Sequence, residues 1–147
     1  MSVDSQVARD LIETLQDGRT GFADAADKLE ATNRAEWATT LRRFSAQRAD
    51  FAAELEKLGA AYGDDVHEDG SLAAKVHRGW MAVKDKLSGS DADGVLDAAV
   101  SGENHTVSEY DDALDKDLSV DLREVVQRQA TAVKAARDEI RALQTAS

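Results

Sequence analysis

Apolar residues recur every three or four positions along four long stretches of the chain, which is the spacing of one face of an α-helix. These stretches cover about residues 4–30, 33–62, 92–116 and 120–145. A shorter stretch over about residues 72–87 shows the same spacing, and polar or glycine-bounded segments separate it from its neighbours. Proline is absent, and runs rich in β-branched and aromatic residues are missing. The pattern therefore predicts an all-α protein.

The lengths of the connections predict how the helices pair. Only a few residues separate the first two long helices and the last two, so each pair is expected to form an antiparallel hairpin. Asn33, followed by Glu36, suggests a capping box at the start of the second helix, and Ser119 is a candidate N-cap for the last. The helix at 72–87 would span roughly 24 Å, most of the length of a bundle. We predict one domain over residues 1–147, a ferritin-like four-helix bundle with a long crossover that carries this short helix.

Three polar residues interrupt the apolar faces near the middle of their helices. Arg48, Glu103 and Gln129 each fall about 20° from apolar residues of the same face, counting about 100° per residue. On the first helix the corresponding position is Gly18. Our hypothesis is that Arg48 pairs with Glu103 inside the bundle, that Gln129 fills a remaining hydrogen bond, and that Gly18 leaves room for the arginine. Tyr110 is expected to direct its hydroxyl into the same polar interior.

Two roles are open for this network, beside the alternative that its members do not meet. It can simply fix the register and pairing of the helices, as buried polar groups do in some proteins. It can instead bind a small polar ligand or an anion beside Gly18. The second role requires a cavity next to Arg48 whose polar atoms the protein leaves unsatisfied.

Di-iron chemistry is the obvious enzymatic alternative for such a bundle, but the metal ligands that it needs are missing from the pattern. Di-iron bundles use a glutamate from each of two helices and Glu-x-x-His from the other two, and no Glu-x-x-His occurs here. The histidines lie in a polar loop (His67), on a helix flank (His77) and opposite the apolar face (His105). Glu13 is also expected to face away from the apolar stripe. We therefore expect no catalytic residues, no metal site and no cofactor.

Charge and composition exclude further classes of function. Acidic residues number 29 against 18 basic ones, for a net charge of −11, which disfavours nucleic acid and anionic membranes as partners. The chain has no cysteine, so disulfides and thiolate metal sites are excluded. No apolar stretch approaches the roughly 20 residues that span a membrane, and the N-terminus lacks the features of a signal peptide. A cytoplasmic location is the expectation.

Several segments resemble an uncharacterised bacterial family of single-domain, ferritin-like four-helix bundles, known as a domain of unknown function. The similar segments come from all five predicted helices, and the segment 77–81 is the most specific: Leu11–Leu15 with Gly18 and Phe22, Gln47–Phe51, Gly70–Leu72 with His77–Met81, Gly102–Glu103 with Tyr110, and Arg137–Arg141. The resemblance implies the fold and gives no substrate, so it implies no catalytic residues.

From the sequence we expect a non-catalytic, ferritin-like helical module that acts through self-association or a protein partner. A role in stress is suggested only by analogy with the fold. A metal-binding or redox protein with an unconventional site stays open, as does a binder of a small polar ligand in the bundle interior.

Overall fold

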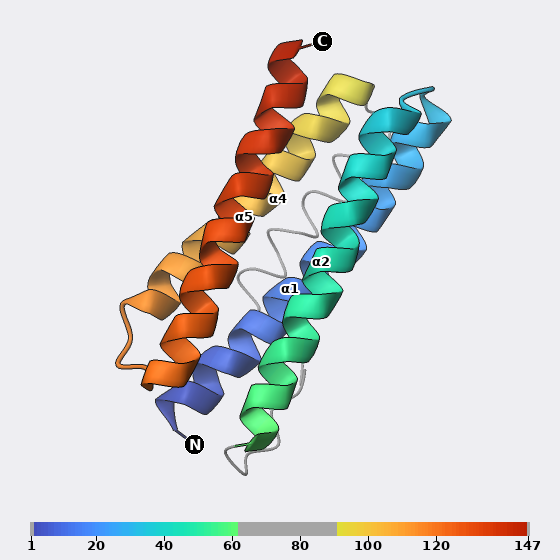
Figure 1. Ribbon diagram of the computed structural model, residues 1–147. Coiled ribbons are helices and arrows are strands. Elements are labelled where there is room, and N and C mark those ends of the chain that lie inside the picture. The colour runs from blue at the N-terminus through green and yellow to red at the C-terminus, as the bar shows by residue number, and fades with distance from the viewer. Residues whose placement is uncertain (1, 62–90, 147) are drawn as a thin grey trace.

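The computed structural model describes residues 2–61 and 91–146, and over these residues the protein is all-α (Figure 1). The helices are α1 (Val3–Ala31), α2 (Ala35–Ala61), α4 (Ala92–Leu114) and α5 (Val120–Ala146). Their bounds agree within two residues with those predicted from the apolar spacing, and no strand occurs in these two ranges. The short helix predicted at 72–87 lies outside the described residues.

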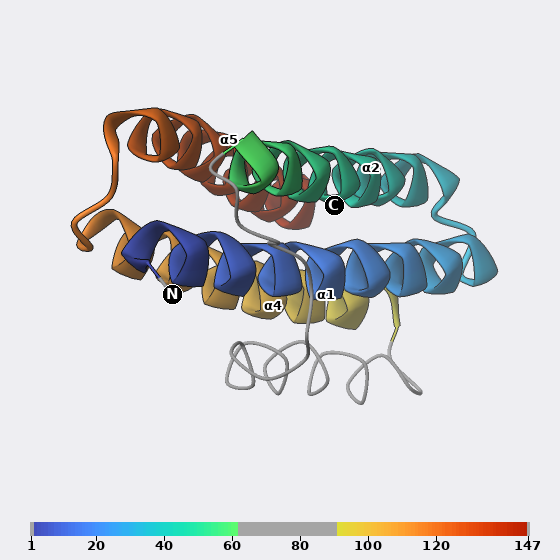
Figure 2. The ribbon, with the colours of Figure 1, turned by 90° about the horizontal axis from the view of Figure 1, so that it is seen from below.

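The four helices pack as a bundle with two antiparallel hairpins. Helix α1 runs antiparallel to α2, and α4 runs antiparallel to α5, as the short connections predict (Figure 1). Each helix packs against two others: α1 contacts α2 and α4, and α5 contacts α4 and α2. Helices α2 and α4 run in the same direction and lie diagonally across the bundle (Figures 1 and 2). The last described residues of α2 and the first of α4 are consequently at opposite ends.

Short polar side chains cap the N-termini of three of the described helices. Ser2 caps α1 and Asp91 caps α4, each accepting a hydrogen bond from a backbone N–H in the first turn. The Ser119 hydroxyl accepts a hydrogen bond of 3.3 Å from the Leu122 N–H, so the cap predicted for α5 is confirmed. These contacts satisfy N–H groups that a helix leaves free at its start.

The capping box predicted at Asn33 is wrong, because Asn33 ends α1 instead of starting α2. Its φ is 64°, in the left-handed region, and its N–H donates to the Glu30 carbonyl. The next N–H, that of Arg34, donates to the Leu29 carbonyl at 2.8 Å. This pair of bonds is the Schellman motif that closes many helices. Asparagine suits both an N-cap and a left-handed C-terminal position, and in so short a turn it can occupy only one of them.

The apolar core consists of two clusters, one toward each end of the bundle. The cluster nearer the α1–α2 turn includes Phe22, Leu29, Trp37, Leu41, Leu96 and Ile140. The cluster at the other end includes Leu11, Leu15, Leu55, Tyr110, Leu122 and Val133. The apolar faces of all four described helices thus contribute to the core, and Arg48 on α2 and Glu103 on α4 interrupt their faces between the two clusters. None of the described helices is both long enough and apolar enough to cross a membrane.

Candidate functional site

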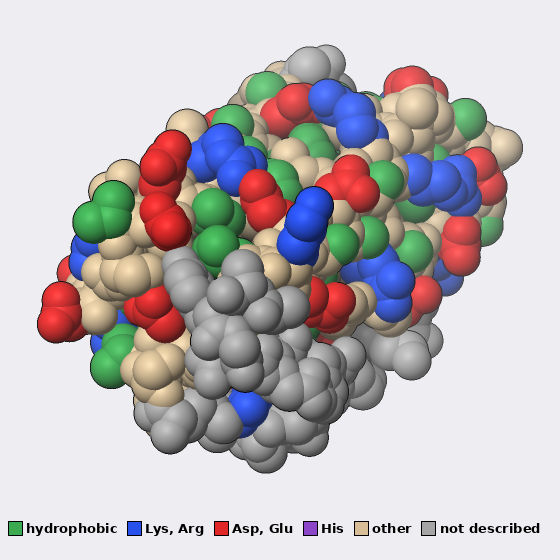
Figure 3. Space-filling model, turned by 60° about the horizontal axis from the view of Figure 1, so that its bottom comes forward, with side chains coloured by type: hydrophobic (Ala, Val, Ile, Leu, Met, Phe, Trp, Pro, Cys, Tyr) green, Lys and Arg blue, Asp and Glu red, His purple; other side chains and the backbone are tan. Residues whose placement is uncertain are grey.

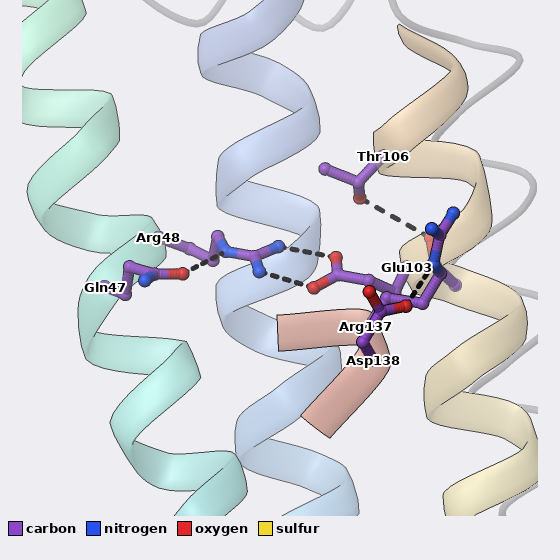
Figure 4. Close-up of polar contacts among 7 residues, drawn as sticks. Gln47, Arg48, Glu103, Thr106, Arg137 and Asp138 are labelled. Carbon is purple, nitrogen blue, oxygen red and sulfur yellow. Dashed lines mark hydrogen bonds and ion pairs between the residues drawn. The ribbon is translucent and has the colours of Figure 1, made fainter. Parts of the chain in front are cut away.

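Arg48 and Glu103 form a two-bond ion pair between the two core clusters (Figure 4). Nη1 of Arg48 donates to Oε1 of Glu103 at 2.6 Å, and Nη2 donates to Oε2 at 2.5 Å. Both side chains are completely buried, with an exposed fraction of 0%. Since α2 carries Arg48 and the diagonal helix α4 carries Glu103, the arginine side chain reaches across the middle of the bundle. The structure therefore brings together the two charged residues singled out in the sequence.

The rest of the guanidinium is also accommodated by protein groups. Nε donates to the side-chain oxygen of the adjacent residue, Gln47, at 3.1 Å. The guanidinium carbon lies 5.1 Å from the centroid of the Phe22 ring, within the range of a cation–π contact. Gly18 is buried and lies on α1 between Leu15, which belongs to one apolar cluster, and Phe22, which belongs to the other. Gly18 thus lies at the level of the ion pair and adds no side chain to the space that Arg48 occupies.

Gln129 takes part in a different network, so the prediction that it completes the hydrogen bonding of Arg48 is wrong. Its Oε1 accepts a hydrogen bond of 2.7 Å from the Tyr110 hydroxyl. Its Nε2 donates to Oε1 of Glu54 at 2.8 Å and to the Phe51 carbonyl at 3.3 Å.

The reason for this difference is the axial level of the residues. Gln129 lies opposite Tyr110, which follows Glu103 by seven residues, or about 10 Å along a helix. On α5, Gln129 is flanked by Val126 and Val133, which both belong to one apolar cluster and not to the boundary between clusters. A residue near the middle of its helix can therefore lie at a different axial level from residues near the middle of the other helices, because the helices are offset along their axes.

The second network leads from the interior to the surface. Tyr110 and Gln129 are fully buried, whereas the Glu54 side chain is 36% exposed and its second partner, Arg128, is 55% exposed. Burial raises the pKa of the Tyr110 hydroxyl above its ordinary range, so it remains a hydrogen-bond donor. Partial burial alone would raise the pKa of Glu54, but hydrogen bonds from Arg128 and Gln129 keep it below its usual value of 4.5.

Glu13 lies away from the apolar stripe of α1, as the helical spacing predicts, but this second face of the helix is not exposed to solvent. Its side chain is buried, with 4% exposed, and the adjoining Ile12 and Thr14 are 0% exposed. Five consecutive buried residues, Leu11–Leu15, cannot all lie on one stripe of a helix, so α1 is enclosed on more than one side here. A single apolar periodicity detects only one buried face, and it therefore missed Glu13. His105 is exposed, as its position opposite the stripe predicts, while His67 and His77 lie outside the described residues.

Gln47, Glu54 and Thr106 are polar contributors that the sequence pattern did not single out. Gln47 and Glu54 are only partly buried and flank the apolar face of α2. Thr106 is fully buried on α4 and donates to the Gly102 carbonyl, one turn before it (Figure 4). In the sequence, each looks like an ordinary polar residue of a helix surface or flank.

The geometry leaves the central pair with little capacity for chemistry. Both oxygens of Glu103 and all three nitrogens of Arg48 have hydrogen-bond partners within the protein. Within residues 2–61 and 91–146, no three His, Asp or Glu side chains gather closely enough to hold a metal ion. A crevice at one end of the bundle, between α1, α2 and α5, is lined in part by Ala8, Leu55 and Leu122 and encloses no space large enough for a water molecule.

A family model described as "Domain of unknown function (DUF2383)" matches residues 5–116, most of the chain. The chain therefore belongs to this family. The match includes α1, α2 and α4 with Arg48, Glu103 and Tyr110, and it ends before α5 and Gln129. The segment Arg137–Arg141, which contributed to the resemblance, lies beyond the matched range. No curated protein matches the chain.

Proposed function

We propose that this member of a family of unknown function is a non-catalytic, ferritin-like helical module that acts through its surface, by self-association or by binding a protein partner. The observation that carries the proposal is the buried Arg48–Glu103 pair. Metal-dependent four-helix bundles direct carboxylates into this part of the interior and keep them available for the metal. In this protein, the central carboxylate is already occupied on both oxygens by a cation from the same chain.

The direction of the helices supports the ferritin-like part of the proposal. Helices α2 and α4 run parallel, so the chain has to join opposite ends of the bundle between two antiparallel hairpins (Figure 2). A single long connection in this position characterises ferritin-like bundles. The cytoplasmic location and the stress setting stay part of the proposal by analogy with that fold.

The surface charge bears on the kind of partner. The net charge of −11 disfavours nucleic acid and anionic membranes. On the face seen in Figure 3, acidic and basic side chains are interspersed without a large patch of one sign. Mixed charge of this kind suits a protein partner or a second copy of the chain better than a polyanion.

The test is metal analysis and mass measurement of the full chain purified without chelators. We expect iron and manganese far below one ion per chain, also after incubation with excess ferrous iron in air, and a mass by light scattering that rises with protein concentration or with a co-purified protein. Stoichiometric metal that is lost in Glu103→Gln and Glu13→Gln, but kept in the exposed control Glu139→Gln, would overturn the proposal. A strict monomer without a partner at all concentrations would also contradict it.

A further inference from the structure

The contact between α2 and α5 differs from those between the other neighbouring helices. The backbones of α2 and α5 approach each other at fewer points than those of any other pair of described neighbours. The hydrogen bonds and ion pairs that cross this contact come mainly from long polar side chains. We define the α2–α5 seam by these groups: Arg43, Phe51 and Glu54 on α2, and Arg128, Gln129 and Glu139 on α5.

Glu54 is the acceptor that joins the two sides of the seam near the middle of α5. One carboxylate oxygen accepts a hydrogen bond from the buried amide of Gln129, and the other accepts a hydrogen bond from the guanidinium of Arg128. Gln129 is held in turn by the Tyr110 hydroxyl on α4 and by the Phe51 carbonyl. The carboxylate therefore lies between a dry interior on one side and a solvent-exposed guanidinium on the other.

The other ion pair of the seam makes no comparable link. Arg43 and Glu139 are 62% and 45% exposed, and neither bonds to a buried polar group of the seam. Water screens such a pair, so it contributes little to holding helices together. Loss of the Glu54 charge, by contrast, removes the Arg128 ion pair and weakens the contact of Gln129 at the same time.

We propose that the bundle opens locally at the α2–α5 seam, and that ionised Glu54 keeps the seam closed. In the open form, α5 separates from α2 around residues 126–133 while α4 remains on α1, and water reaches Tyr110 and Gln129. The groups that face Glu54 are Arg128 and Gln129 from α5 and Tyr110 from α4. Because the guanidinium and the amide both donate to the carboxylate, protonation of Glu54 weakens both contacts, and acid favours the open form.

Hydrogen–deuterium exchange of the full chain, followed by mass spectrometry at neutral pH, tests this proposal. In Glu54→Gln, we expect α5 peptides covering residues 126–133 to exchange about three- to tenfold faster than in the wild type, because a charged hydrogen-bond acceptor is lost. Peptides of α1 should exchange at the wild-type rate. The control Glu139→Gln, which removes only the exposed ion pair, should change the α5 rate by less than about twofold.

Two results would overturn the proposal: unchanged α5 exchange in Glu54→Gln, or equal acceleration in all helices, since the latter reports global unfolding. A wild-type measurement at mildly acidic pH, corrected for intrinsic exchange, covers the case in which Glu54→Gln does not fold. At that pH, exchange should be accelerated in α5 only. Equal acceleration in all helices at that pH would contradict local opening at the seam.

Discussion

Replacement of Glu103 by leucine should destabilise the protein severely, because it leaves the Arg48 guanidinium buried without its carboxylate. The pair has no access to solvent, so water cannot take the place of the lost partner. Removal of one partner from a buried ion pair costs about 3–5 kcal/mol. Since small domains are stable by about 5–15 kcal/mol, this loss is a large part of the total.

A second replacement should recover most of that loss. In the double variant Arg48→Met with Glu103→Leu, no charge is left between the two apolar clusters at this position, and apolar side chains fill the same space. Exchanges of buried ion pairs for apolar residues are often neutral, or stabilising by about 1–4 kcal/mol. The double variant is therefore expected to be close to the wild type in stability, and far more stable than Glu103→Leu alone.

Urea unfolding followed by far-ultraviolet circular dichroism measures both effects. With a denaturant dependence of about 2 kcal/mol per molar urea, the single variant should lower the midpoint by roughly 1.5–2.5 M. The surface control Glu139→Leu should remain within about 1 kcal/mol of the wild type. A shift below about 0.5 M for Glu103→Leu would show that Arg48 is not stranded by the loss of its carboxylate, and it would refute the reasoning about the buried pair.

Three further predictions concern the network of Tyr110, Gln129 and Glu54 and the glycines of α1. Tyr110→Phe should cost about 1–3 kcal/mol in urea unfolding, because it leaves the buried oxygen of Gln129 without its donor. The lowered pKa of Glu54 means that its contribution to stability is present above its unfolded value of 4.5 and is lost as the pH falls through the folded pKa; Glu54→Gln should therefore flatten the fall in melting temperature between about pH 6 and 3. Gly18→Leu should destabilise by about 1–3 kcal/mol through overpacking, whereas Gly21→Ala, at a less buried position of the same helix, should stabilise by about 0.5–1 kcal/mol.

The helices and the charged pair were predictable from local spacing. An apolar residue every three or four positions defines α1, α2, α4 and α5 with little ambiguity, since no proline and few competing patterns interrupt them. Arg48 and Glu103 stand within these stripes, and a charge inside an apolar stripe needs a partner of opposite sign. The axial level of Gln129 was not predictable, because the offset between helices depends on packing along their whole length. The burial of Glu13 was missed for a related reason: enclosure of a second face leaves no simple period in the sequence.

The diagonal position of the ion pair indicates what it contributes to the fold. Arg48 and Glu103 join α2 and α4, which run in the same direction and face each other across the bundle centre. A buried ion pair adds little net stability over apolar packing, but it strongly penalises any arrangement that separates its charges. We therefore expect the pair to disfavour helix registers and arrangements that separate Arg48 from Glu103, more than it stabilises the native fold. Gly18, which has no side chain, leaves space for the arginine that reaches across the bundle.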